Sequence, residues 1–282
     1  MLSLVILTRN SREYIKACLD SVFMQDVRDV EVFVVDNAST DGTKELIREG
    51  WPQVRLLENR DNLGASAARN QGIERSSGEW VLTLDSDVVL GKGFLKGFDV
   101  DQSRFAPEVA MVQPNVLDRD GKTIYSQGIY LSALRRFFDL NRGKSGDFSG
   151  NGGKKIIGPC SAAAFYRRSM LEALKEATGY FDERFFFLVE DADLAWRARR
   201  SGWKVLFDPR RVCFHAGNSS GTDKKLRQYL SFRNRHWMIA KNEGPLGKAV
   251  LWVLSFPYEL ARILSMALFN KYLWTEMGTK NL

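Results

Sequence analysis

Four short apolar runs, each separated from the next by a helical segment, constrain the fold of this chain most. The runs lie at residues 4–7, 30–35, 54–57 and 80–84. Apolar residues at helical spacing lie between them, at 13–23, 43–49 and 65–74. Strands that alternate with helices through short connections predict an α/β fold with a mostly parallel central sheet, because right-handed crossovers return each strand beside an earlier one.

Polar residues stand where three of these strands would end. Thr8 follows the first run, Asp36 the second, and the triplet Asp85-Ser86-Asp87 the fourth. Ligands of parallel α/β sheets bind beyond the carboxyl ends of the strands, so these turns predict one shared crevice. The first strand is followed neither by Gly-x-Gly-x-x-Gly nor by a Walker loop, which argues against a dinucleotide or P-loop site.

The triplet Asp85-Ser86-Asp87 has the chemistry of a metal-diphosphate site. Side chains alternate along a strand, so the two carboxylates would point the same way. Like charges that close raise each other's pKa unless a cation lies between them. Hard divalent ions such as Mg²⁺ are held by one or two carboxylates plus substrate phosphates. An acidic turn after a buried strand explains the triplet alone equally well, but the convergence of three polar turns favours a site.

A second acidic group follows the aromatic run at 185–187. Glu190, Asp191 and Asp193 open a helix that Gly202 would end. Acidic residues in a first turn are ordinary helix caps, but a cap does not need three carboxylates behind an apolar wall. Apolar surroundings raise the pKa of a carboxyl group toward the range of a general base. His215 ends a later apolar run, and its side chain could either pack in the core or bind a metal ion.

Two glycine-rich stretches lie in the middle of the chain. Residues 141–155 contain five glycines among Ser, Asn and Lys, which is typical of an active-site lid or of a disordered loop. Residues 158–164 are small, so the backbone could approach a ligand closely there, although tight packing of two elements explains the composition as well.

The C-terminal third is basic. Residues 195–282 carry 16 Lys/Arg against 5 Asp/Glu, a charge of +11 in a chain whose total is +7. Anionic lipid, a phosphate-bearing acceptor and nucleic acid are candidate partners, beside a merely solvated face. Two apolar blocks, at 249–258 and 263–269, are each shorter than the 18 residues of a spanning helix, and they suggest a helix pair in a membrane interface or a homodimer contact.

The length of the sequence and its cysteines predict how the chain is divided and where it is located. We expect a catalytic α/β domain at 1–225 and a basic, apolar helical extension at 226–282. Cys18, Cys160 and Cys213 have no disulfide or zinc spacing, and Met1 leads directly into a strand without a signal peptide. These features predict a cytoplasmic protein, peripherally attached to the membrane through the extension.

Several separate motifs then occur in one order along the chain. They are TRN at 8–10, VVDNASTDGT at 34–43, NLG at 62–64, ARN at 68–70, LDSD at 84–87, EDADLAWR at 190–197, GW at 202–203 and His215. Over residues 3–220 this pattern resembles family 2 inverting glycosyltransferases of the GT-A fold. Within that family it is most similar to the bacterial rhamnosyltransferase-like branch. Leu7 replaces the proline usual near the end of the first strand.

The resemblance implies a metal-dependent transfer of a sugar, with inversion, in cell-surface polysaccharide synthesis. The donor would be a nucleoside-diphosphate sugar, dTDP-rhamnose or a UDP-linked hexose, and the acceptor a glycan or a lipid-linked sugar. Carried over by position, the residues that hold the donor are Thr8, Asp36, Arg69, Asp85 and Ser86. Asp87 and His215 would bind Mg²⁺ or Mn²⁺. Asp191 would be the general base, although Glu190 and Asp193 crowd it.

Three other functions would each explain part of the sequence. A non-catalytic nucleotide-sugar or glycan-binding module would explain the strand-end crevice but not the acidic triplet at 190–193. A sugar nucleotidylyltransferase would need a glycine-rich loop after the first strand, and residues 8–12 contain no glycine. Nucleic-acid binding through the tail leaves the N-terminal motifs unexplained, so no nucleic acid is expected as a partner.

Overall fold

The computed structural model describes residues 1–27, 29–145, 155–217 and 221–275. The strands are β1 Leu2–Thr8, β2 Val30–Asp36, β3 Arg55–Glu58, β4 Trp80–Asp85, β5 Val88–Leu90, β6 Val109–Asp118, β7 Ile124–Ser126, β8 Ile129–Leu131, β9 Phe137–Asp139, β10 Ala163–Arg167 and β11 Lys204–His215. The α-helices are α1 Ile15–Phe23, α2 Thr43–Gly50, α3 Gly64–Arg75, α4 Phe98–Arg104, α5 Arg168–Leu174, α6 Glu190–Arg200, α7 Lys224–Asn242, α8 Pro245–Phe269 and α9 Tyr272–Thr275. A 3₁₀ turn, η1, covers Glu183–Phe185.

One mixed sheet forms the centre of the molecule, in the order β3-β2-β1-β4-β10-β6-β11-β5. The first four strands in that order are parallel, as the alternation of runs and helices predicts. β10 is antiparallel to both of its neighbours, and β6 and β11 run parallel to each other. The carboxyl ends of β1, β2 and β4 therefore lie together at one edge, and Thr8, Asp36 and Asp85 stand there.

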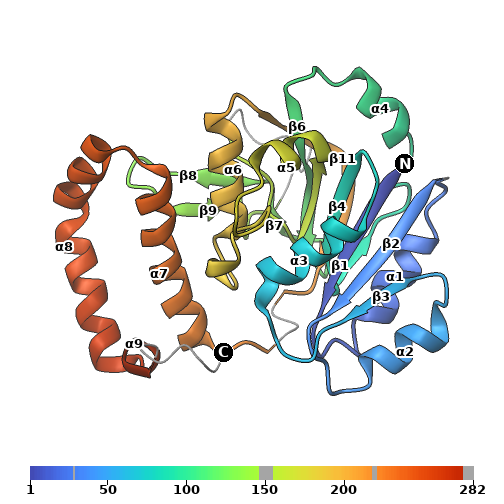
Figure 1. Cartoon of the computed structure of the whole chain (residues 1–282), viewed down its shortest axis with the longest axis horizontal. Coiled ribbons are helices and arrows are strands. Elements are labelled where there is room, and N and C mark those ends of the chain that lie inside the picture. The colour runs from blue at the N-terminus through green and yellow to red at the C-terminus, as the bar shows by residue number, and fades with distance from the viewer. Residues whose placement is uncertain (28, 146–154, 218–220, 276–282) are drawn as a thin grey trace.

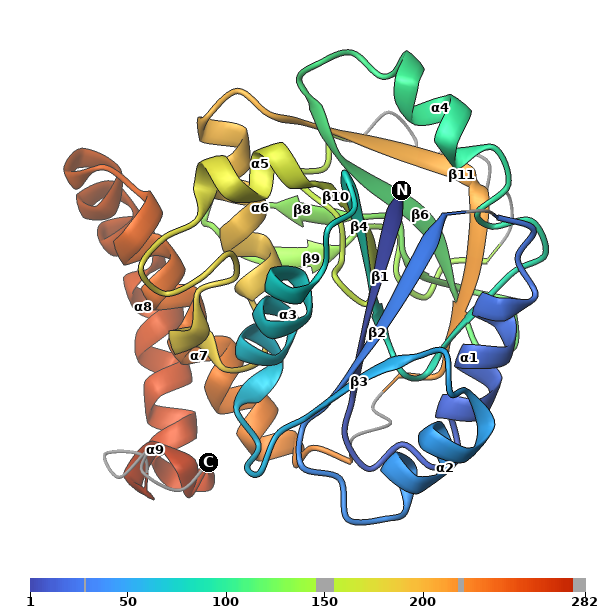
Figure 2. The same ribbon diagram turned by 45° about the vertical axis from the view of Figure 1, so that its right-hand side comes forward.

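Helices cover both faces of the sheet, so its strands are apolar on both sides (Figure 1). On one face α1, α2 and α4 pack against alternate residues of β1 and β4. On the other face α3, α5 and α6 pack against the residues between them. Leu4 and Ile6 belong to the first layer and Val5 to the second, as period-two alternation requires. Figure 2 shows β1, β2 and β3 fanned between these layers.

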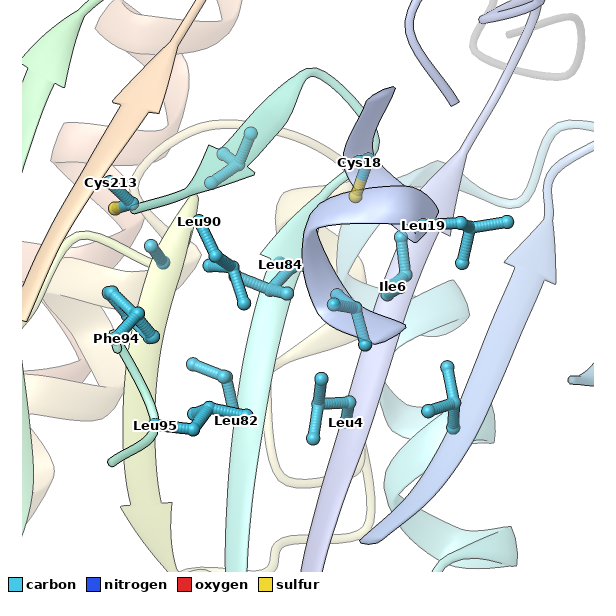
Figure 3. Packing of buried hydrophobic residues seen from close by; sticks show 14 of the residues in the cluster. Leu4, Ile6, Cys18, Leu19, Leu82, Leu84, Leu90, Phe94, Leu95 and Cys213 are labelled. Atoms are coloured by element: carbon cyan, nitrogen blue, oxygen red, sulfur yellow. The ribbon is translucent and has the colours of Figure 1, made fainter. Parts of the chain in front are cut away.

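The first layer is where two of the three cysteines are found. Figure 3 shows Cys18 and Leu19 of α1 above Leu4 and Ile6 of β1, with Leu82 and Leu84 of β4 beside them. Cys213 packs at the far end of the same cluster, near Leu90. All three cysteines are free, as their spacing predicts, and burial raises the pKa of the Cys18 and Cys213 thiols above the usual range.

Two details of the second half differ from the expected pattern. The segments at 204–207 and 212–215, which a turn at Asp208-Pro209 would separate, form one strand, β11, with an irregularity of register between Asp208 and Val212. The apolar blocks of the tail form a single helix of 25 residues, α8, that contains Pro257. The prediction of a helix pair there was wrong, because Pro257 is accommodated inside a helix that packs only along one stripe.

The C-terminal hairpin, α7 and α8, stands beside the sheet rather than on it (Figure 1). α7 lies against α6, and α8 lies along the outer side of α7. Among the residues described, α8 is the one helix that is long and apolar enough to cross a membrane, judged by length and composition only. Division of the chain at residue 225 stays a prediction; α7 begins at Lys224.

Candidate active site

A pocket of about 560 Å³ opens at the carboxyl ends of β1, β2 and β4. One half of its lining is polar and comes from strand ends, from the turn before α3 and from α3 itself: Arg9, Ser11, Asn37, Asn62, Arg69, Asp85, Ser86, Asp87 and His215. The other half is largely apolar and comes from β8, β9, the segment before α6, and α7: Ile129, Phe137, Phe138, Phe186, Phe187, Leu188, Val189, Leu226 and Leu230. Asp191 lines the pocket too.

Three potential metal ligands meet on the polar side. Ligand atoms of Asp85, Asp87 and His215 lie within 4.8 Å of one another. His215 Nε2 is 3.1 Å from Asp87 Oδ1. Two neighbouring ligands of one octahedral ion, each about 2.1 Å from it, would be about 3.0 Å apart. The spacing therefore fits a shared divalent cation, and an imidazole in the set suits a transition ion such as Mn²⁺ better than Mg²⁺.

The sheet register brings these ligands together across 128 residues of chain. β4 ends at Asp85, the chain turns through Asp87, and β5 leaves as an antiparallel partner of β11. Within that pair His215 lies opposite Val88, directly after Asp87. The Tyr125 ring meets the His215 ring edge-on, with centroids 4.1 Å apart, and so holds the imidazole in place. The His215 pKa is raised, because its bond to Asp87 outweighs the opposing effect of burial.

Thr8 and Asp36 lie under the polar floor of the pocket. Both side chains are almost fully buried, and Thr8 Oγ1 and Asp36 Oδ2 have no hydrogen-bond partner among the described residues. Burial raises the Asp36 pKa despite its bond from the Ser39 backbone N–H. Buried polar atoms normally have partners, so these two are suited to receive donors from a ligand. Ser86 differs, because its hydroxyl donates to Ser11 Oγ at 2.8 Å.

Arg69 of α3 joins the two acidic motifs. Its guanidinium donates to Asp85 Oδ1 at 2.8 Å and to Glu190 Oε1 at 2.6 Å. The arginine and Glu190 are buried, and Asp85 is partly exposed. The two carboxylates raise the pKa of Arg69, against the effect of burial. Arg69 therefore lines the pocket, but two of its nitrogens already bind carboxylates of the protein.

Asp191 and Glu190 of the second acidic group both line the pocket, and Asp191 is the one of the two without an ion pair among the described residues. Its Oδ2 accepts from the Ser161 backbone N–H at 3.1 Å, and its Oδ1 from the Ala192 N–H at 2.8 Å. No Lys or Arg of the described residues forms an ion pair with it. Burial and then the neighbouring Glu190 raise the pKa of Asp191 to about 7. Such a carboxylate is poised to take a proton near neutral pH.

Glu190 and Asp193 serve other purposes. Glu190 neutralises Arg69. Asp193 is fully buried and binds Arg197, Lys241 and Asn242, so it joins α6 to α7 on the side away from the pocket. The three carboxylates that crowd together in the sequence therefore lie in three different surroundings.

Some residues of the pocket were not anticipated from the sequence. Ser161, which orients Asp191, lies in the small-residue stretch, where close packing of Gly158 against Ala195 is the other cause of the composition. Arg142 stacks over the Tyr125 ring at 4.2 Å and pairs with Asp139, close to the metal ligands. No motif marks these side chains. The lid expected at 141–155 falls mostly outside the described residues.

The sheet, the strand-end pocket and its acidic groups define a GT-A-type α/β enzyme, and comparisons with known proteins agree. The model of glycosyl transferase family 2 matches residues 3–175. The chain belongs to that family and is a glycosyltransferase, with inversion consistent with the family. The prediction of its fold and family from the sequence is confirmed.

Two kinds of relative are similar to the chain. It is 29% identical, over 90% of its length and 89% of theirs, to the N-acetylglucosaminyl-diphospho-decaprenol L-rhamnosyltransferase of Mycobacterium tuberculosis. Among solved structures it resembles the mannosyltransferase PcManGT of Pyrobaculum calidifontis in complex with GDP-Man and Mn²⁺, with a TM-score of 0.62, 20% identity and coverage of 95% and 75% of the two chains. It also resembles S. aureus TarS, with a TM-score of 0.60 and 21% identity over 86% of this chain but 40% of TarS. At such identities the two structures support the fold alone.

Proposed function

We propose that this chain transfers a sugar, rhamnose by first choice, from a nucleoside-diphosphate donor to a hydroxyl of a lipid-linked glycan in cell-surface polysaccharide synthesis. The donor nucleotide would be dTDP or UDP, and a divalent cation, Mn²⁺ or Mg²⁺, would be required. One observation carries the proposal: Asp191, a carboxylate that forms no ion pair with any described residue, shares a pocket with the Asp85–Asp87–His215 group.

The polar half of the pocket suits the donor. Asp36 and Thr8 lie beneath this half, each with a buried oxygen that has no partner among the described residues, where a base and ribose would be held. Asp85 and Ser86 line the same pocket beside Asp87, where the sugar-diphosphate would extend. When bound by Asp87 and His215, the divalent cation would neutralise the departing diphosphate. Arg142, stacked beside the His215 partner Tyr125, adds a positive charge near that leaving group.

Asp191 would act on the acceptor. Ser161 and the Ala192 N–H fix its carboxylate, and it takes the proton from the acceptor hydroxyl as that oxygen attacks the anomeric carbon. The C–O bond to the acceptor forms as the bond to the diphosphate oxygen breaks, on opposite faces of the carbon, so the configuration inverts. Arg69 pairs with Glu190 beside the base and offsets part of its negative charge.

The apolar half of the pocket supports an acceptor with a hydrocarbon part. Phe137, Phe138, Leu226 and Leu230 offer far more apolar surface than a nucleotide sugar needs. From the Phe138 rim a row of stacked side chains continues to α8: Arg136 over Phe138 at 5.3 Å and over Tyr258 at 4.8 Å, then Arg262 over Phe232 at 5.0 Å. Alternating rings and guanidinium groups suit an anionic amphiphile.

The hairpin α7–α8 would place this entrance at the inner face of the membrane. Only Leu251, Ser255 and Met266 of α8 are buried, so most of its apolar circumference faces outward. Lys248 and Arg262 lie on the same helix. A helix with exposed apolar residues and flanking basic charge fits a membrane interface, and a lipid-linked acceptor would then reach the pocket without leaving the bilayer.

A thermal-shift panel tests the donor site. The purified chain is heated with UDP, dTDP or GDP, each with Mn²⁺, Mg²⁺ or EDTA. Ligand at about 100 times its Kd adds about 2.7 kcal/mol of stability, a shift that is easily measured. We expect one diphosphate to stabilise the protein only with metal, and Asp87→Ala to abolish that shift. Asp20→Ala, an exposed carboxylate of α1 paired with Lys16, is the matched control.

Failure would point elsewhere. If no nucleotide shifts the melting temperature with either metal, the proposed donor site is wrong. If a shift occurs but the enzyme transfers no sugar to any acceptor, the chain is a nucleotide-sugar-binding module on this fold.

A further inference from the structure

The segment that delivers Asp191 has an unfavourable backbone. Phe186, Leu188 and Val189 have φ values of 63°, 68° and 75°, and α6 begins at the next residue. Non-glycine residues rarely adopt positive φ, and a β-branched valine there is an outlier that costs on the order of 1–3 kcal/mol. The segment therefore holds this shape only where its surroundings impose it.

One side chain of α7, Asn234, imposes much of that shape. Its Nδ2 lies 2.9 Å from the Phe185 carbonyl oxygen, 2.9 Å from that of Phe187 and 2.8 Å from that of Leu188. Asn234 is fully buried. The guanidinium of Arg233 donates to its Oδ1 at 3.0 Å, which fixes the orientation of the amide toward the three carbonyls.

The fourth carbonyl of the segment is held from the opposite side. Phe186 O accepts from the Ala65 N–H at 2.6 Å and the Ser66 N–H at 3.3 Å, so it caps the first turn of α3. A Cβ on Gly64 would meet that oxygen at 2.5 Å, which explains the glycine at this close approach. The segment is thus clamped between α3, which carries Arg69, and α7.

This clamp is continuous with the proposed base. Val189 O accepts from the Asp193 N–H at 2.9 Å in the first turn of α6. A shift of the segment therefore moves Asp191 relative to Ser161 and to the pocket. We infer that Asn234 is a positioning residue for the transfer reaction, which sets the place of Asp191 by fixing the strained segment before it. The inference rests on the proposed role of Asp191 as base.

Kinetics of Asn234→Ala test the inference, with Asn270→Ala as the matched control. Asn270 is also a buried asparagine of the C-terminal hairpin, and its amide binds the Lys225 carbonyl, away from the segment. The assay uses dTDP-rhamnose and a synthetic N-acetylglucosaminyl diphosphate with a short prenyl chain. We expect Asn234→Ala to lower kcat about 10- to 100-fold with an unchanged KM for the donor, because a displacement of about 1 Å costs that much.

A second measurement separates positioning from general loss of stability. Hydrogen–deuterium exchange of the peptide that spans 185–191 should accelerate in Asn234→Ala and stay as in the wild type in Asn270→Ala. In the Asp191→Asn background, removal of the Asn234 amide should cost no further rate, since the group it positions is gone. The inference would be overturned if Asn234→Ala lowered kcat equally in the wild-type and Asp191→Asn backgrounds. It would also be overturned if Asn234→Ala and Asn270→Ala lowered kcat equally. If instead the wild type shows no metal-dependent rise in melting temperature with any nucleotide, the proposed function is wrong.

Discussion

Glu190 and Asp191 are consecutive carboxylates in opposite electrostatic surroundings. Glu190 Oε1 lies 2.6 Å from the Arg69 guanidinium, whereas Asp191 accepts hydrogen bonds only from Ser161 and Ala192 within the described residues. Burial raises the pKa of both carboxyl groups, and the ion pair with Arg69 opposes that rise at Glu190, so Asp191 is the better candidate for a base. This difference is the basis of the first two predictions.

Asp191→Asn should fold and bind the donor but fail to transfer. The amide keeps the size of the side chain and one acceptor oxygen for the Ser161 N–H, so packing is preserved. Loss of a general base costs about 100- to 10,000-fold in rate. The measurements are kcat with donor and acceptor, and the metal-dependent thermal shift with the nucleotide. Asp20→Asn, at a surface carboxylate of α1, is the control. A near-normal kcat for Asp191→Asn would assign the base elsewhere.

The pH dependence of transfer should follow Asp191. Its pKa is raised to about 7, and a base must be deprotonated to act, so kcat/KM should rise tenfold per pH unit below about pH 7 and level off above it. Metal is kept saturating, because protonation of His215 competes with metal binding. Glu190→Gln should move the rise to lower pH, since the Glu190 charge contributes to the raised pKa. An unmoved profile in that variant would show that another group titrates.

The sequence was enough to predict the strand–helix order, the parallel half of the sheet and the acidic motifs, because periodicity and strand ends are local features. It could not predict the roles of Ser161, Arg142 or Asn234. Ser161 reaches Asp191 across 30 residues, and Asn234 reaches the 185–188 carbonyls across more than 45. Such partners depend on how α6 and α7 pack. The helix pair expected from the blocks at 249–258 and 263–269 is one helix, α8, with Pro257 inside it.

Arg69→Met should destabilise the fold. The change leaves the Asp85 and Glu190 carboxylates facing each other without their shared cation, and breaking a buried ion pair costs about 3–5 kcal/mol. Urea unfolding at pH 7 measures the loss. Glu190→Gln added to Arg69→Met should restore part of it, because one buried charge is removed. The deficit should also shrink as the pH is lowered, since burial raises the Glu190 pKa and the carboxyl group can take up a proton. Additive losses in the double variant would show that the two residues do not interact.

Exposed leucines of α8 should govern membrane binding. Leu254 and Leu268 are 63% and 74% exposed, outside the buried stripe of Leu251, Ser255 and Met266. Burial of one leucine side chain is worth about 1.5–3 kcal/mol, so Leu254→Gln with Leu268→Gln should weaken partition into phosphatidylglycerol vesicles by more than tenfold. Vesicle sedimentation measures this. Met24→Gln, at an exposed apolar position after α1, should bind as the wild type does.

Membrane binding should also depend on charge, because basic residues lie on α8 together with these leucines. Binding should be weaker to neutral phosphatidylcholine vesicles and should fall as salt is raised, because Lys248 and Arg262 attract anionic lipid over about one Debye length. Thermal melting of the double variant should match the wild type, since both leucines lie outside the packed stripe of α8. If the wild type does not sediment with vesicles but forms dimers that the double variant loses, α8 binds a second copy of the chain instead of a membrane.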